Sequence, residues 1–175
     1  MKETIIIIGA NGQIGTELAI ALRSKFGVDQ VITSDIRAPK NLADGEIFET
    51  INVLDKAGLK DLFEKYKPTQ IYLLAAMLSA TGEQYPQKAW DLNMNGLLNV
   101  LDLCVELGIK KIFWPSSIAV FGPNSPKKNT EQYCVMDPNS IYGISKLAGE
   151  RLCEYYHAKY DLDIRSVRYP GIISW

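Results

Sequence analysis

The fold of this chain is decided by residues 4–15, TIIIIGANGQIG. Ile5 to Ile8 are β-branched and apolar without interruption, which is typical of a strand covered on both faces of a parallel sheet. A helix is predicted behind the glycines, because apolar residues recur there at every fourth position: Ile14, Leu18, Leu22 and Phe26. A strand, a glycine-rich turn and a helix in this order are typical of the first βα unit of a dinucleotide-binding sheet.

The glycine-rich turn is the first candidate for a cofactor site. Gly9, Gly12 and Gly15 are spaced G-x-x-G-x-x-G, whereas the standard fingerprint is G-x-G-x-x-G. In that fingerprint the glycines allow a tight turn, close approach of the backbone to a pyrophosphate, and close packing of helix on strand. The helix N-terminus adds unpaired N–H groups and a partial positive charge. The other predicted cofactor contacts of this turn are Asn11, Gln13 and Ile14.

A carboxylate ends the second predicted strand, residues 31–35. Asp35 lies 20 residues after Gly15, where an acid accepts hydrogen bonds from the adenosine ribose hydroxyls. Its charge would repel a 2′-phosphate, so NAD is the predicted cofactor rather than NADP. Ile36 and Arg37 complete the predicted contacts, and the charge of Arg37 would weaken the preference for NAD.

Strands and helices alternate along the rest of the chain. Further strands are predicted at 47–51, 71–76, 111–115 and 164–168, and long helices at 87–107 and 140–160. A small polar loop is expected at 79–83 and a turn-rich loop at 123–138. Alternating elements of this kind imply right-handed crossovers. We therefore predict one α/β domain over residues 1–175, a doubly wound, Rossmann-like parallel sheet with strand order 3-2-1-4-5-6 and helices on both faces.

The composition is that of an ordinary soluble domain. The chain has 175 residues, is 47% hydrophobic and 22% charged, and has a net charge of −1. Near-neutral charge gives no electrostatic footprint for nucleic acid or an anionic membrane, so neither is an expected partner. The apolar runs are too short to span a bilayer, and the N-terminus runs straight into a strand without a signal peptide. A cytoplasmic location is expected.

Cysteine and histidine exclude several kinds of chemistry. Cys104, Cys134 and Cys153 are odd in number and widely spaced, so neither a disulfide framework nor a zinc site is expected. His157 is the only histidine, which makes a Ser-His-Asp triad improbable. No metal site is predicted, and any proton chemistry must come from another side chain.

Tyrosine is the candidate for that role. Tyr142 and Lys146 are four residues apart on a predicted helix and therefore share one face. A phenol has an unperturbed pKa of about 10, and a nearby ammonium group favours the phenolate and lowers that pKa. Such a tyrosine could act as a general base at neutral pH. The spacing alone is weak, since most helical Tyr/Lys pairs are an amphipathic ring beside a solvated charge.

The glycines, Asp35, Ser117, Tyr142 and Lys146, in this order, resemble the extended short-chain dehydrogenase/reductase family. The resemblance implies that Ser117 acts with the Tyr/Lys pair, and Ser116 is the neighbouring alternative. It also implies further NAD contacts in two groups. The first is Asn52 and Val53 at the adenine, although the family usually has Asp in place of Asn52. The second lines the rest of the cofactor: Leu74, Ala75, Ala76, Asn93, Tyr169 and Pro170.

Three segments, 78–83, 114–123 and 168–175, are similar to the short-chain type of L-threonine 3-dehydrogenase within that family. The similarity implies oxidation of the L-threonine 3-hydroxyl by NAD to 2-amino-3-oxobutyrate, with Tyr142 as general base. Zinc-dependent threonine dehydrogenases are a different family, and the low cysteine and histidine content argues against them independently. The implied substrate contacts are Ser79, Thr81, Gly82, Ser116, Ser117 and Tyr142.

Family members are typically nearly twice as long, with substrate-capping segments after the sixth strand. We therefore expect the cofactor domain and catalytic residues to be present here and the C-terminal substrate lobe to be largely absent. Two other functions remain open: a sugar-nucleotide epimerase or dehydratase, and a catalytically inactive NAD-binding or dimerisation module. The resemblance also implies a homodimer through helices 87–107 and 140–160.

Overall fold

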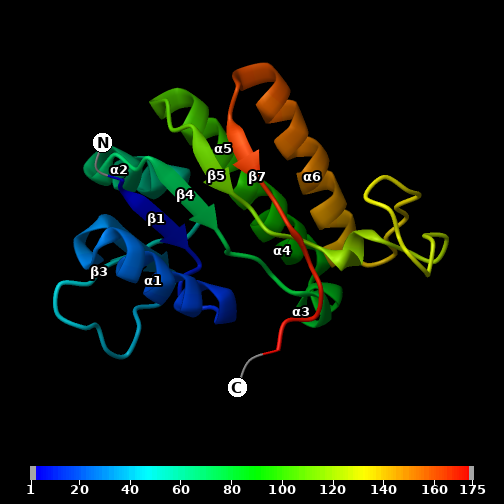
Figure 1. Cartoon of the computed structure of the whole chain (residues 1–175), viewed down its shortest axis with the longest axis horizontal. Helices are drawn as coiled ribbons and strands as arrows, with labels where there is room; N and C mark the ends of the chain where they lie inside the picture. The colour runs from blue at the N-terminus through cyan, green and yellow to red at the C-terminus, as the bar shows by residue number, and fades with distance from the viewer. Residues whose placement is uncertain (1–2, 174–175) are drawn as a thin grey trace.

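The computed structural model describes residues 3–173, which form a parallel α/β sheet with helices on both faces (Figure 1). Within these residues the main sheet has six strands in the order β3-β2-β1-β4-β5-β7. The predicted order 3-2-1-4-5-6 is confirmed, because the sixth strand of this sheet is labelled β7. The strands are β1 (Ile5–Ile8), β2 (Val31–Asp35), β3 (Ile47–Thr50), β4 (Gln70–Leu73), β5 (Lys111–Phe113) and β7 (Asp163–Arg165).

Strand β1 occupies the centre of the sheet. Ile5 pairs in parallel with Val31 of β2 on one side and with Gln70 of β4 on the other. Ile5, Ile6 and Ile7 are fully buried. Burying a side chain of this size stabilises a fold by about 2 kcal/mol. The uninterrupted apolar run is therefore explained by burial on both faces of the sheet.

Two apolar clusters hold helices on opposite faces. On one face α1 (Gln13–Phe26) places Ala19 and Leu22 against Ile5 and Ile7. On the other, α2 (Lys56–Tyr66), α5 (Gly96–Leu107) and α6 (Ile141–Tyr160) pack around alternate residues of the same strands, including Ile6 and Ile8. The period-two alternation of β1 thus divides its side chains between both halves of the core.

Two helical predictions need correction. The helix predicted at 87–107 contains α4 (Pro86–Trp90), a π-helical turn (Asp91–Asn95) and α5, so it is helical throughout but not uniformly α. The polar loop predicted at 79–83 is wrong, because these residues begin the short helix α3 (Ser79–Gln84). Gly82 of α3 is buried beside Ala89 and Ile141. Tertiary packing therefore overrides the weak helix propensity of this segment.

The sixth predicted strand, 164–168, is broken. Its first part is β7, and its end forms β8 (Arg168–Tyr169), which pairs with β6 (Ser116–Ser117) as a separate parallel ribbon. The ribbon aligns Ser116 with Arg168 and Ser117 with Tyr169. It continues beyond the end of β5 and β7, so it carries these residues to the carboxyl edge of the sheet.

The segment 123–138 is irregular, as predicted, and extends from the body beside the start of α6 (Figure 1, yellow). After β8 the chain runs past α3 toward α1 (Figure 1, red). Within residues 3–173, no helix has the length and apolar character needed to cross a membrane.

Candidate active site

A cavity of about 420 Å³ lies at the carboxyl ends of β1, β4 and β5. This is where doubly wound sheets bind their ligands. Fourteen of the predicted site residues line it: Gly9, Gly12, Gln13, Ile14, Gly15, Leu74, Ala76, Ser79, Ser116, Ser117, Tyr142, Lys146, Tyr169 and Pro170. The glycine turn and the Ser/Tyr/Lys set, which are far apart in sequence, therefore face one cavity.

The three glycines of the turn meet different steric demands. A Cβ at Gly9, whose φ is +88°, would lie 2.5 Å from the Ala75 nitrogen, and one at Gly15 would lie 2.6 Å from the Gly9 oxygen. These two positions exclude larger residues by contact within the protein. At Gly12 the nearest atom to an added Cβ is the Gly9 oxygen at 3.4 Å, and Gly12 lines the cavity. A methyl group there would occupy space that a dinucleotide backbone could fill.

The start of α1 fits an anion. The helix has no side-chain cap at Gly12 and no acidic residue in its first turn. Its first N–H groups and the helix dipole therefore favour a negatively charged group in the cavity. The glycine cradle and this helix terminus together fit the pyrophosphate of NAD.

The predicted ribose contacts lie together beside the turn but outside the cavity lining. Asp35 Oδ2 accepts a hydrogen bond from the Asn11 backbone N–H at 3.0 Å, and its Oδ1 accepts one from the Ile36 N–H at 2.8 Å. Asn11 Nδ2 donates to the Arg37 carbonyl at 2.6 Å. Asp35 is thus held at the end of β2 with its carboxylate next to the glycine turn.

Four other predicted cofactor residues are not in the cavity lining. Asn52 Oδ1 accepts from the Leu54 N–H at 3.0 Å and closes a turn. Val53 is buried, 2% exposed, and Ala75 lies against Gly9. Asn93 is also buried, and its amide is committed to three protein contacts: Met77 N–H, Met77 carbonyl and Ser145 hydroxyl. The structure therefore gives Asn93 a role in joining the loop after β4 to α6.

The first turn of α6 places Tyr142 beside Ser117. Ser140 caps the helix, because its Oγ accepts from the Gly143 N–H at 3.0 Å, and Glu83 of α3 accepts from the Ile141 N–H at 2.7 Å. Partial burial raises the pKa of Tyr142, and a hydrogen bond with Ser117 acts in the opposite direction. Ser117 is therefore close enough to the phenol of Tyr142 to influence its pKa.

Lys146 is buried, with 2% of its surface exposed. Its Nζ donates to the Pro115 carbonyl at 2.7 Å and lies 4.4 Å from the Trp114 ring centroid and 5.6 Å from that of Tyr142. Burial lowers the pKa of Lys146 to about 8.

The expectation that Lys146 lowers the pKa of Tyr142 is not met in the protein alone. Burial is the largest influence on both groups, and it opposes the charged form of each. The ammonium group is directed at Pro115 and Trp114 rather than at the phenol oxygen. A sequence pattern shows that two side chains share a helix face. It does not show how deeply each is buried, and burial is what sets these pKa shifts.

The two adjacent serines have different partners. Ser116 Oγ donates to Glu150 Oε1 at 2.6 Å and is committed to that carboxylate. Ser117 Oγ accepts from the Ala119 N–H at 3.2 Å and interacts with Tyr142. The geometry therefore favours Ser117 over Ser116 as the serine that acts with the tyrosine.

The predicted substrate segment is only partly at the cavity. Ser79 lines it, whereas Gly82 is buried between helices and Thr81 is exposed on α3 outside the lining. Four lining residues were missed: Leu78, Pro115, Gly171 and Ile172. All four lie within the segments 78–83, 114–123 and 168–175 that resemble the family, so that resemblance was the signal that could have found them. The last two residues of the predicted segment 168–175 lie outside the described residues.

Within residues 3–173, no three His, Cys, Asp or Glu side chains are grouped so that they could hold a metal ion. Cys104, Cys134 and Cys153 are free thiols. Burial raises the pKa of Cys153 to about 12, so it is not a reactive thiolate.

Sequence comparison agrees with this geometry. Residues 5–174 match the family described as NAD dependent epimerase/dehydratase. The chain belongs to this family. NAD is therefore the cofactor. A curated relative, an uncharacterised epimerase/dehydratase of Staphylococcus saprophyticus, is 49% identical over 97% of this chain and 53% of its own length.

Solved structures of family members are also similar. A partial-consensus L-threonine 3-dehydrogenase is 54% identical with a TM-score of 0.94, covering 98% of this chain and 55% of that one. The holo form of a GalE-like L-threonine dehydrogenase from Cupriavidus necator is 53% identical with the same TM-score, covering 98% of this chain and 56% of that one. The chain thus spans about half the length of the relatives it matches.

The steric role of Gly9 leads to a first prediction. Gly9→Ala should lower the free energy of unfolding by about 2–5 kcal/mol, because it combines left-handed backbone strain with overpacking against Ala75. Gly108→Ala is the matched control, since Gly108 has φ +71° but no atom within 4 Å of an added Cβ. Urea denaturation measures both. Equal losses in the two variants would contradict a contact-based role for Gly9.

Proposed function

We propose that the site oxidises the 3-hydroxyl of L-threonine with NAD, giving 2-amino-3-oxobutyrate. The observation that carries this proposal is that Ser117, Tyr142 and Lys146 line the same cavity as the glycine cradle. Both solved structures quoted above are described as L-threonine dehydrogenases, which supports the choice of substrate.

In the proposed reaction Tyr142 removes the proton from the substrate hydroxyl. NAD held by the glycine cradle would supply the hydride acceptor for the carbon that carries this hydroxyl. Ser117 orients the hydroxyl and stabilises its oxygen as it becomes a carbonyl oxygen. Burial holds the pKa of Tyr142 above its ordinary value, so the phenolate is a minor form at neutral pH. Its share, and with it the rate of proton removal, should grow as the pH rises.

Lys146 supplies a positive charge near this centre. With a pKa of about 8, it is mostly protonated at pH 7 and loses its proton as the pH rises through that value. We infer that its ammonium group binds the nicotinamide ribose and favours the phenolate of Tyr142 when the cofactor reduces access of water. At the substrate end, Ser79 is the proposed partner of the amino-acid carboxylate. Thr81 and Gly82 belong to the same helix, α3, and are proposed to hold Ser79 in place.

The test is formation of NADH by this chain from NAD and L-threonine, followed by absorbance at 340 nm. NADP is compared as cofactor, because Asp35 should disfavour its 2′-phosphate. A full-length relative serves as the positive control. Conversion of a UDP-sugar without NADH from threonine would instead support the epimerase or dehydratase alternative. NADH binding by calorimetry without turnover of either substrate would support an inactive NAD-binding module.

A second copy of the chain is the proposed protein partner, through helices 87–107 and 140–160. Three large side chains of this region are considerably exposed: Trp90 (39%), Ile144 (42%) and Tyr155 (51%). Such exposed apolar groups favour association. A relative 44% identical to this chain is described as monomeric, so the state must be measured. Sedimentation velocity should give the mass of two chains, and a single-chain mass would remove this proposal.

A further inference from the structure

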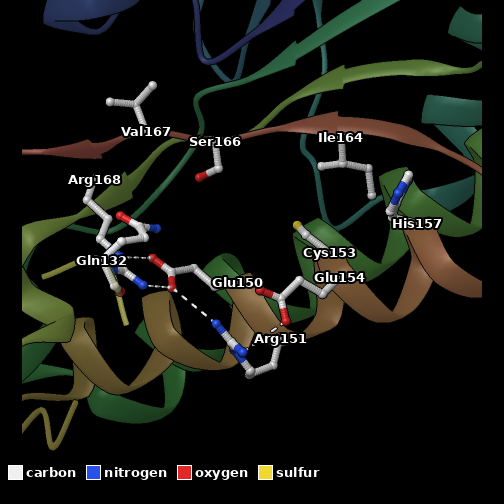
Figure 2. Close-up of a pocket in the computed structure, with 10 residues that line it drawn as sticks. All are labelled: Gln132, Glu150, Arg151, Cys153, Glu154, His157, Ile164, Ser166, Val167 and Arg168. Atoms are coloured by element: carbon white, nitrogen blue, oxygen red, sulfur yellow. Dashed lines mark hydrogen bonds and ion pairs between the residues drawn. The ribbon is translucent and has the colours of Figure 1, made fainter. Parts of the chain in front are cut away.

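A second cavity, of about 470 Å³, lies between α6 and the segment that joins β7 to β8 (Figure 2). Glu150 of α6 and Arg168 of β8 point toward each other in it. Both side chains are only 10% exposed. No step of the proposed reaction uses this pair, although it lies close in sequence to residues that do.

The Glu150–Arg168 pair is held in place by hydrogen bonds to both residues. Arg168 Nε donates to Glu150 Oε1 and its Nη2 donates to Oε2, each at 2.7 Å. The Ser116 hydroxyl donates to the same Oε1 at 2.6 Å, and Arg168 Nη1 donates to the Gln132 carbonyl at 2.8 Å. Burial acts to raise the pKa of Glu150, but the hydrogen bonds from Arg168 and Ser116 lower it overall. The carboxylate is therefore charged and bound on both oxygens.

The three side chains of this network, Ser116, Glu150 and Arg168, each lie close in sequence to a residue of the candidate active site. Ser116 precedes Ser117, and Arg168 precedes Tyr169; these two pairs are aligned in the β6–β8 ribbon. Glu150 lies one helical turn after Lys146 on the helix that also carries Tyr142. The single carboxylate thus joins α6 to both strands of the ribbon.

An exposed ion pair lies close by and serves as a comparison. Arg151 and Glu154 are 2.9 Å apart, with side chains 50% and 56% exposed (Figure 2). Exposed pairs contribute little, whereas a buried bidentate pair fixes geometry even where its net stabilisation is small. Positioning is therefore a better account of the Glu150–Arg168 pair than stability alone.

We propose that Glu150 and Arg168 are positioning residues of the oxidoreductase site, which hold the Ser117 hydroxyl against Tyr142 through Ser116 and the β6–β8 ribbon. The inference rests on the proposed function for the meaning of that contact. Neither residue touches the reacting atoms. Their effect on the site passes through Ser117.

The test compares Glu150→Gln with Glu154→Gln, the same chemical change at the exposed pair. Tyrosine labelled with ¹³C at Cζ reports the titration of Tyr142 by NMR, with the signal assigned through Tyr142→Phe. Loss of the Ser117 hydrogen bond should raise the Tyr142 midpoint by about half a pH unit or more in Glu150→Gln. Removing a negative charge would by itself lower that midpoint, and Lys146, the charged group facing Tyr142, is unchanged. The direction of the shift therefore separates positioning from simple electrostatics.

Turnover provides the second readout. Threonine oxidation should fall about 10- to 100-fold in kcat with little change in KM, as expected when a catalytic group is slightly displaced. Ser116→Ala removes the hydroxyl link without changing charge and should shift the midpoint upward as well. If circular dichroism shows that Glu150→Gln is not folded, the Ser116→Ala result alone tests the proposal.

The proposal would be overturned if the Tyr142 midpoint in Ser116→Ala and in folded Glu150→Gln matched that in Glu154→Gln. A downward shift in both variants would overturn it as well. If the unmodified chain forms no NADH from threonine, the proposed function fails, yet the NMR titration still tests the positioning pair. The two ideas are therefore refuted by different measurements.

Discussion

Replacing Tyr142 with phenylalanine is expected to lower kcat for threonine oxidation about 10²- to 10⁴-fold, the usual contribution of a positioned general base. The change removes one oxygen atom and leaves the ring on α6. The glycine cradle belongs to the turn between β1 and α1 and is not altered by this change. NADH binding, measured by fluorescence, should therefore remain close to that of the unmodified chain.

Tyr155→Phe is the matched control for this experiment. Tyr155 lies on the same helix, 51% exposed, and its hydroxyl contacts Lys159 at 2.7 Å rather than any residue of the cavity. It should retain full turnover. Retained turnover in Tyr142→Phe would remove the tyrosine from the mechanism, whereas loss of NADH binding would show that the variant disturbs the cavity.

Replacing Lys146 with methionine should abolish most turnover without lowering stability at pH 7. The buried ammonium group has its pKa lowered from 10.5 to about 8, which corresponds to a cost of about 3 kcal/mol at neutral pH. Methionine removes this cost, although it leaves the Pro115 carbonyl without its donor, which costs about 1–3 kcal/mol. The free energy of unfolding should therefore be unchanged or slightly higher. A loss of turnover without a loss of stability would mark Lys146 as functional.

The pH dependence gives this prediction a sign. The folded pKa of Lys146 lies below the unfolded value, so the unfolded chain binds more protons between pH 8 and 10.5. Stability contributed by this group is lowest below pH 8 and should rise by about 2 kcal/mol between pH 7 and 9.5. Urea denaturation at both pH values should show the rise in the unmodified chain and lose it in Lys146→Met. Lys159→Met, at the exposed end of the same helix, should keep it.

The central sheet was predictable because the burial of its strands is visible in the sequence as apolar runs. Ile5 to Ile8 have no polar face, so they require neighbours on both sides and both faces. Alternation with helices then sets the order of the parallel strands. The boundaries were less predictable, and α3 was missed because Gly82 adopts helix only through its packing on Ala89 and Ile141.

The candidate site was predictable where chemistry follows a strand end. Gly9 directly follows β1, and Ser117 lies just beyond the predicted strand 111–115, so topology alone places both at the carboxyl edge. The partners of Asn93 and Ser116 were not predictable, because Met77, Ser145 and Glu150 are distant in sequence from them. The same holds for Lys146, whose burial depends on Trp114.

The β6–β8 ribbon has a consequence for folding. Ser116 and Arg168 are 52 positions apart, and closing a loop of that length costs about 3–4 kcal/mol of chain entropy. Pairing of β7 with β5 brings the two ends of this loop together, and β7 is an edge strand with a single neighbour in the described sheet. Fraying of that edge would separate Ser117 from Tyr169 while β1 stayed paired on both sides. We therefore expect the alignment of Ser117 with Tyr169 to be lost more easily than the pairing of the central strands.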